Sequence, residues 1–245
     1  MGHVRTTNTR TRFTEIASNS TLPVGTLPET AMVLGTRAVE FSGVGRMSVP
    51  TISPIPFEES LHDGDDSWMW AETALETSSH ILADGIATNE ATLITDGSYY
   101  RDLAPTKGGA CWILETHGNS THQAAGCLRS TGTTATAYRS ELSGIYGGLR
   151  FVKKLCASTG VTSGSLRVGC DNLLAVQRCK GGLKVPTRVA HSDILICIRR
   201  LVYDLPITVT FFHVYGHQDN NVEYGELPRD AQLNVLCDLN AKAFL

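Results

Sequence analysis

The 245-residue sequence predicts an α/β domain, a mixed β-sheet with helices packed on it, that follows a largely unstructured N-terminal segment. From Ala91 onward, runs typical of strands and helices follow one another in the order βββαβααβα. Hairpin-linked strands followed by alternating helices and strands indicate a sheet that is partly antiparallel and partly parallel. Residues 1–60, in contrast, are rich in Ser, Thr and Pro and show no sustained period, which is typical of a linker.

The net charge of −3 is unevenly distributed along the chain. Residues 1–87 contain 5 Lys and Arg against 11 Asp and Glu, a net charge of −6, whereas residues 88–245 carry +3. We therefore predict a domain over 88–245 and, before it, an acidic linker or polyprotein remnant. Apolar residues at near-helical spacing predict one short amphipathic helix within that segment, at 68–82. A disordered acidic segment throughout is the alternative.

The spacing of apolar residues along the chain predicts the strands and helices of the domain. Alternating or continuous apolar runs predict strands at 91–95, 109–115, 122–128, 166–170 and 207–214. Spacing of i, i+3, i+4 and i+7, with Pro228 at a favoured first helical position, predicts helices at 137–157, 172–178, 192–203 and 228–243.

No apolar run approaches the roughly 20 residues that a membrane-spanning helix needs. The sequence therefore predicts a protein that does not cross a membrane. Seven cysteines occur without a C-x-x-C pair, and most have apolar neighbours, as reduced thiols do. A reducing compartment, the cytoplasm or the nucleus, is the expected location.

Four acidic residues are candidates for one site. Asp96 and Asp171 each end a predicted strand, and the carboxyl ends of parallel strands form the functional crevice of an α/β sheet. Glu141 and Asp238 lie on helices that can lean over the same edge. Carboxylates that converge with no nearby Lys or Arg bind hard divalent cations, and two such ions suit phosphodiester hydrolysis.

Each acidic residue also has an ordinary interpretation. Asp96-Gly97 is a common turn dipeptide, and Glu141 can be a solvated helix residue. Asp171-Asn172 can cap the short helix that follows, and Asp238 can form an i, i+4 pair with Lys242. The combination of these residues in order is more specific than any one of them.

In combination, these residues resemble ribonuclease H of type 1 over about 150 residues, from near Ala91 to the C-terminus. The resemblance is greatest to the ribonuclease H domain of a retroelement reverse-transcriptase polyprotein. The motifs that carry it are Thr95-Asp96-Gly97-Ser98, Gly108-Gly109-Ala110, Tyr138-Arg139-Ser140-Glu141-Leu142, Cys170-Asp171-Asn172, Gly216-His217-Gln218 and Leu233-Asn234-x-x-x-Asp238-x-x-Ala241.

The resemblance implies a ribonuclease-H-like mixed five-stranded sheet with helices on both faces, and endonucleolytic hydrolysis of the RNA strand of RNA–DNA hybrids. It implies that His217 assists the attacking water or product release, and that Asn234 orients that loop or a ligand. An exposed helix amide is the alternative for Asn234. It further implies that two Mg²⁺ ions, with Mn²⁺ as a substitute, are held by Asp96, Glu141, Asp171 and Asp238.

Binding a polyanionic hybrid requires phosphate contacts. The resemblance assigns these to a short basic loop, with a solvated polar loop as the alternative. The start of the long helix is instead a candidate for contacts to the 2′-hydroxyl groups of the RNA strand. The candidate contacts are Arg139, Arg178, Lys180, Lys184 and Arg188. A reverse-transcriptase polymerase domain in a longer polyprotein is the expected protein partner.

Some residues depart from the family. Tyr215 stands where the family often has Lys, and the segment after the first strand differs from the usual glycine-rich turn. A catalytically silent module that binds nucleic acid or serves as a scaffold is the alternative function, because the basic loop is short and lacks an aromatic residue between its cations. The complete set of four carboxylates argues for an enzyme.

Overall fold

The computed structural model describes residues 56–62, 66–102, 105–131 and 135–244, together with three short strands near the N-terminus. The chain divides into two compact units, Met1–Pro54 and Ile55–Leu245. In the first unit, β1 (Gly2–Arg5), β2 (Phe13–Ile16) and β3 (Val33–Leu34) form an antiparallel sheet in the order β2-β1-β3. Apart from these strands, the predicted lack of regular structure before residue 56 lies outside the described residues.

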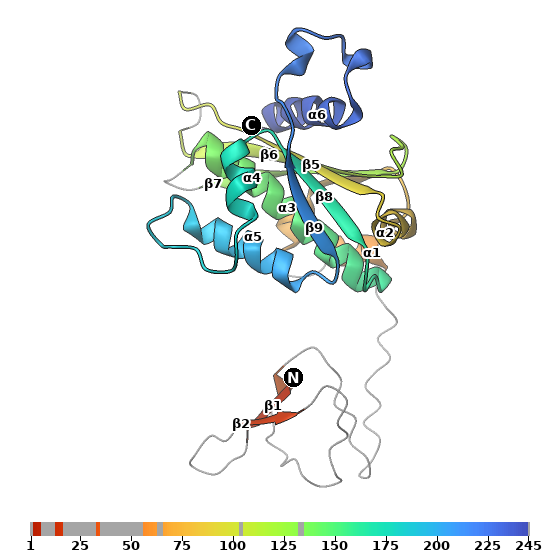
Figure 1. The fold of residues 1–245 in the computed structure, drawn as a ribbon, viewed down its shortest axis with the longest axis vertical. Helices are drawn as coiled ribbons and strands as arrows, with labels where there is room; N and C mark the ends of the chain where they lie inside the picture. The colour runs from red at the N-terminus through yellow and green to blue at the C-terminus, as the bar shows by residue number, and fades with distance from the viewer. Residues whose placement is uncertain are drawn as a thin grey trace. The chain divides into compact units, whose positions relative to one another are not determined.

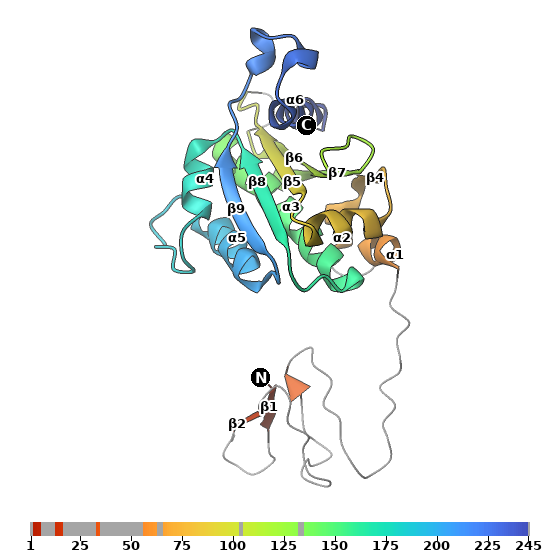
Figure 2. The same cartoon turned by 45° about the vertical axis from the view of Figure 1, so that its right-hand side comes forward.

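The second unit is built on a six-stranded mixed sheet in the order β4-β7-β6-β5-β8-β9 (Figures 1 and 2). The strands β4, β7, β6 and β5 pair in antiparallel fashion, whereas β5, β8 and β9 pair in parallel. Their bounds are β4 Glu72–Leu75, β5 Ala91–Ser98, β6 Lys107–Thr116, β7 Gln123–Thr131, β8 Ser165–Cys170 and β9 Thr208–His213. The five predicted strands are confirmed, and β4 is an additional edge strand.

Helices cover both faces of the sheet, as predicted (Figures 1 and 2). The larger core contains residues of α1 to α5 packed on one face, and a smaller core contains residues of α6 packed on the other. The bounds are α1 Phe57–His62, α2 Ser79–Ala87, α3 Ala137–Thr159, α4 Leu173–Cys179, α5 Ser192–Asp204 and α6 Arg229–Ala243, with short 3-10 helices η1 Ser67–Trp70, η2 Gln218–Asn220 and η3 Tyr224–Glu226. From β5 to α6, the strands and α-helices follow one another in the order that the sequence predicted.

The predicted boundary at residues 87/88 is wrong, since the compact unit begins at Ile55. The predicted helix at 68–82 is also wrong, because η1, β4 and the start of α2 occupy that range. Trp68, the first residue of the predicted helix, is exposed, and the buried residues beside it are Met69 and Trp70. A 3-10 turn followed by a short strand places its buried side chains differently from an α-helix.

Residues 56–87 belong to the core of the domain. Phe57 packs edge-on against Phe151 of α3, and Trp70 does the same at a centroid distance of 6.3 Å. Asp66 forms ion pairs with Arg150 and Lys154, which also lie on α3. This segment therefore supports the long helix that carries Glu141.

Close packing fixes α3 against β5. The Thr136 hydroxyl accepts a hydrogen bond from the Arg139 backbone N–H at 3.1 Å and so caps the first turn of the helix. A Cβ atom at Gly97 would overlap the backbone of Ser140 and Glu141. Glycine at position 97 thus allows the start of α3 to approach the end of β5.

Within the described residues, none of the helices is both long enough and apolar enough to cross a lipid bilayer.

Candidate active site

Two carboxylates lie at the carboxyl ends of neighbouring parallel strands. Asp96 lies near the end of β5, and Asp171 directly follows β8. In the register of these strands, Thr95 is paired with Cys170, so the residues that follow them lie at the same edge of the sheet. The predicted placement of Asp96 and Asp171 is thus confirmed by the topology.

Glu141 reaches the same edge of the sheet from α3, which packs on the face opposite to α6. It lies one turn into α3, and only 7% of its surface is exposed. The Cys170 thiol donates a hydrogen bond to Glu141 Oε2 at 3.6 Å. Sequence patterns gave Cys170 no role because it continues the apolar alternation of Leu166 and Val168.

Helix α6 supplies Asn234 and Asp238. The buried Asn234 amide donates a hydrogen bond from Nδ2 to Asp96 Oδ2 at 3.2 Å, and the Gly97 backbone N–H donates to Asp96 Oδ1 at 2.6 Å. The exposed-amide interpretation of Asn234 is therefore wrong. Asn234 holds one oxygen of Asp96 in place.

The acidic groups raise one another's pKa values. Burial, followed by the charges of Asp171 and Asp238, raises the pKa of Asp96 to about 8. Burial and the charges of Asp96 and Asp171 raise the pKa of Glu141 well above its usual range. Burial likewise raises the pKa of Asp171, although the charge of His217 opposes this shift. The site concentrates negative charge that the protein does not fully neutralise, which is typical of a cation-binding centre.

The donor atoms suit a hard divalent cation. Glu141, Cys170 and Asp171 present ligand atoms that all lie within 4.8 Å of one another. Carboxylate oxygens are preferred by Mg²⁺ and Mn²⁺. Burial and then the charge of Glu141 raise the pKa of the Cys170 thiol, so it remains a hydrogen-bond donor rather than a thiolate ligand.

Asp238 differs from the other three carboxylates. Lys242 Nζ lies 2.6 Å from Asp238 Oδ2, one helical turn away on α6. The i, i+4 interpretation of Asp238 is therefore correct, and the expectation that no Lys or Arg lies near the carboxylates is wrong at this position. Asp238 is still close enough to raise the pKa of Asp96.

His217 lies in the segment between β9 and η2, in the left-handed backbone region with φ of 53°. It is close enough for its charge to lower the pKa of Asp171. Asn172 caps α4, because its Oδ1 accepts a hydrogen bond from the Ala175 N–H at 3.1 Å. The cap therefore uses Asn172 and leaves the Asp171 carboxylate at the sheet edge.

The predicted nucleic-acid contacts lie outside the carboxylate group. Arg139 binds Asp193 through two hydrogen bonds of 3.0 and 2.8 Å, so its guanidinium is already engaged. The Arg178 guanidinium lies 5.8 Å from the ring centre of Tyr138, one turn before Glu141. The loop between α4 and α5 exposes Lys180, Lys184 and Arg188.

No family model matches the sequence, and no curated protein matches it. Similar solved structures were found. The N-terminal RNase H domain of Rv2228c from Mycobacterium tuberculosis, solved as a fusion with maltose-binding protein, is 17% identical, with a TM-score of 0.40 over 64% of this chain and 100% of that chain. LC11-RNase H1 in complex with an RNA/DNA hybrid is 15% identical, with a TM-score of 0.41 over 64% of this chain and 100% of that one. The protease–reverse transcriptase of prototype foamy virus is 19% identical, with a TM-score of 0.44 over 63% of this chain and 20% of that one.

Proposed function

We propose that this protein hydrolyses the RNA strand of RNA–DNA hybrids in a reaction that depends on divalent cations. One observation carries the proposal: Asp96, Glu141, Asp171 and Asp238 come from four separate elements and approach one another closely enough to shift pKa values. An oxygen-rich centre at the carboxyl ends of parallel strands suits metal-assisted phosphodiester hydrolysis.

The four carboxylates would hold two Mg²⁺ or Mn²⁺ ions. When bound, such ions activate water and stabilise charge on the attacking and leaving oxygens. Asn234 fixes the orientation of Asp96, and the Cys170 thiol restrains Glu141. These two neighbours would hold the carboxylates in place before a cation arrives, which reduces the reorganisation needed on binding.

His217 would transfer protons at the edge of this site. A histidine can accept and release protons near neutral pH. Its position beside Asp171 suits assistance to the attacking water or protonation of the departing product. The backbone segment that carries it is held by the Gln218 side chain, which donates to the Tyr215 carbonyl at 2.7 Å.

The proposed biological setting is the ribonuclease H part of a retroelement reverse transcriptase, inside the cell. A polymerase domain would be the protein partner in that setting. The exposed cations of the α4–α5 loop would contribute contacts to hybrid phosphates, because Lys and Arg supply most of the affinity for a polyanion.

The test is cleavage of an end-labelled RNA strand annealed to DNA, with Mg²⁺, with Mn²⁺ and with chelator. Single-stranded RNA, duplex RNA and duplex DNA are the comparison substrates. We expect metal-dependent internal cleavage of the hybrid alone. Intact RNA with tight hybrid binding would support the silent binding module instead, and intact RNA without binding would reject the hybrid as the substrate of this chain.

Lys242→Met is expected to tighten Mn²⁺ binding about fivefold. Lys242 Nζ competes with a cation for Asp238 Oδ2, and a partly exposed ion pair of this kind is worth about 1 kcal/mol. Titration calorimetry with Mn²⁺ measures the change in affinity. The matched control is Lys153→Met, which removes the same charge from α3 at a pair with Asp204. Equal affinities for wild type and Lys242→Met would show that Lys242 does not compete with the cation.

A further inference from the structure

The α4–α5 loop is organised by one side chain from α5. Arg199 donates from Nε and from one terminal nitrogen to the Arg178 carbonyl at 2.9 and 2.6 Å. Its other terminal nitrogen donates to the carbonyls of Gly182 and Lys184 at 2.6 and 3.0 Å. One guanidinium thus binds three backbone carbonyls that span residues 178–184.

The loop sequence is suited to this contact. A Cβ atom at Gly181 would overlap the Arg199 guanidinium, so glycine at this position lets the loop close around the side chain. The Arg178 carbonyl belongs to the last turn of α4, where it also accepts a long hydrogen bond, of 3.4 Å, from the Gly181 backbone N–H. Arg199 therefore adds two shorter hydrogen bonds to a carbonyl at the end of the helix.

The loop that Arg199 holds also carries exposed cationic side chains. The carbonyls of residues 178, 182 and 184 accept hydrogen bonds from Arg199. Lys180 and Lys184 of the same loop are exposed. Arg178, next to Tyr138, brings the loop to the first turn of α3, which also carries Glu141.

We propose that Arg199 is a positioning residue for nucleic-acid binding, which shapes the 178–184 loop so that Lys180 and Lys184 contact phosphates of a hybrid seated at the carboxylate site. This inference rests on the proposed function. A flexible loop would have to be ordered on binding, and a preformed loop avoids that entropic cost. Arg199 therefore acts on the affinity for the hybrid and not on the chemical step.

The decisive comparison is between Arg199→Met and Arg200→Met. Both variants remove one positive charge from α5, but Arg200 is exposed and pairs with Asp204 instead of the loop. We expect Arg199→Met to raise the KM for hybrid about tenfold with kcat within twofold of wild type. Arg200→Met should leave both within twofold.

Binding is measured separately by fluorescence anisotropy of a labelled hybrid, in the Asp96→Asn background so that the RNA stays intact. Arg199→Met should raise Kd to the same extent as KM. The logarithm of the association constant should also fall less steeply with the logarithm of the salt concentration, because about one or two phosphate contacts are lost. Lys180→Gln/Lys184→Gln should reproduce both changes without altering Tm, since the Arg199 contacts to the backbone remain.

Several outcomes would overturn the inference. These are an unchanged Kd in Arg199→Met, equal losses in Arg199→Met and Arg200→Met, or a fall in kcat that parallels a fall in Tm. If Arg199→Met does not fold, an unchanged Kd in the double lysine variant overturns it as well. If the wild-type protein neither binds nor cleaves the hybrid, the proposed function itself fails. If the wild-type protein binds the hybrid and these variants bind it equally well, only the role of Arg199 fails.

Discussion

Asp96→Asn is expected to slow metal-dependent cleavage of the hybrid by about a thousandfold or more. Asp96 lies close to two other carboxylates, since the charges of Asp171 and Asp238 both raise its pKa. Cation-assisted charge stabilisation supplies several kcal/mol to hydrolysis, and about 4 kcal/mol corresponds to a thousandfold change in rate. Single-turnover cleavage with Mg²⁺ measures the effect. Asp102→Asn, an exposed neighbour with the same change of charge, should cleave at the wild-type rate.

The same substitution is expected to stabilise the metal-free protein at pH 8. Burial and neighbouring charges raise the pKa of Asp96 from 3.8 to about 8, so the folded state keeps a proton that the unfolded chain has lost. Between those pH values, this carboxyl therefore reduces the free energy of unfolding by about 1.4 kcal/mol per pH unit as the pH rises. An amide at position 96 does not ionise, and its oxygen can still accept the Gly97 hydrogen bond.

Urea unfolding with chelator at pH 5 and at pH 8 tests this expectation. The difference in unfolding free energy between Asp96→Asn and wild type should be several-fold larger at pH 8 than at pH 5. Excess Mn²⁺ at pH 8 should stabilise wild type much more than the variant, because the cation binds only where the carboxylates are ionised. A pH-independent difference would mean that Asp96 is ionised throughout and that the carboxylates do not repel one another as described.

Most of the sheet was predictable because its elements have strong local patterns. The continuous apolar run of β5 and the 3.6-residue period of α3 are visible without any tertiary information. Asp96 and Asp171 could be placed together because each directly ends a predicted parallel strand. The order of the elements along the chain was sufficient for that inference.

Residues 56–87 were not predictable for the opposite reason. Their buried side chains, such as Phe57 and Trp70, lie in a two-turn helix and a 3-10 turn that are too short to show a period. These side chains pack against Phe151 of α3, and Asp66 of the same segment pairs with Arg150, so the partners lie more than 80 residues later in the chain. The acidic composition of the segment further obscured its packing.

Roles that depend on long-range partners were also invisible in the sequence. Arg199 has no motif, and its function follows only from the loop carbonyls that it meets. Cys170 continues an apolar alternation, and nothing local distinguishes it from a core thiol. The i, i+4 spacing predicted Lys242 as a partner of Asp238. Whether Asp238 can form this pair and still belong to the carboxylate site depends on how α6 packs over β5, which the sequence does not show.

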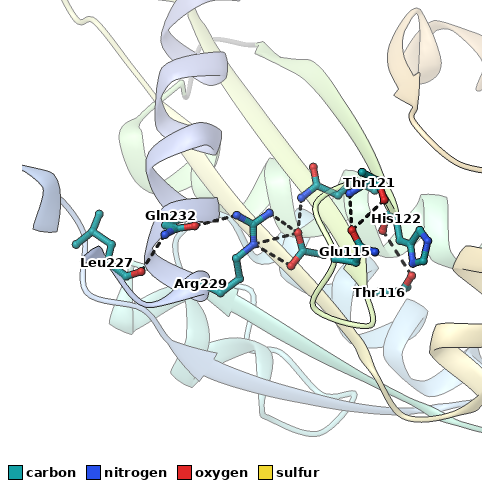
Figure 3. A network of polar contacts seen from close by, with 9 residues as sticks. Glu115, Thr116, Thr121, His122, Leu227, Arg229 and Gln232 are labelled. Carbon is teal, nitrogen blue, oxygen red and sulfur yellow. Dashed lines mark hydrogen bonds and ion pairs between the residues drawn. The ribbon is translucent and has the colours of Figure 1, made fainter. Parts of the chain in front are cut away.

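An ion pair between the buried Glu115 and the half-buried Arg229 fixes the start of α6 on the sheet (Figure 3). Glu115, at the end of β6, is 3% exposed and accepts hydrogen bonds from Arg229 and from Gln123. Arg229 also donates to Gln232 Oε1 at 2.9 Å, and the Gln232 amide donates to the carbonyls of Tyr224 and Leu227. The network therefore joins β6 and β7 to the helix that carries Asn234 and to the segment after His217.

Arg229→Met is expected to reduce the free energy of unfolding by about 3–5 kcal/mol, because it leaves the buried Glu115 carboxylate without its cation. Glu115→Leu/Arg229→Met should recover most of that loss, since replacing both partners with apolar groups leaves no buried charge.

The matched control is Arg167→Met. Arg167 pairs with Asp230, in the same turn of α6 as Arg229, at a much more exposed position, so this substitution should cost about 1 kcal/mol. Urea unfolding of wild type and these three variants at pH 7 measures the losses and the recovery in the double variant. Two results would contradict this: equal losses of unfolding free energy in Arg229→Met and Arg167→Met, or a double variant less stable than Arg229→Met. Either would mean that apolar packing of α6, and not this ion pair, holds Asn234 and Asp238 beside the other carboxylates.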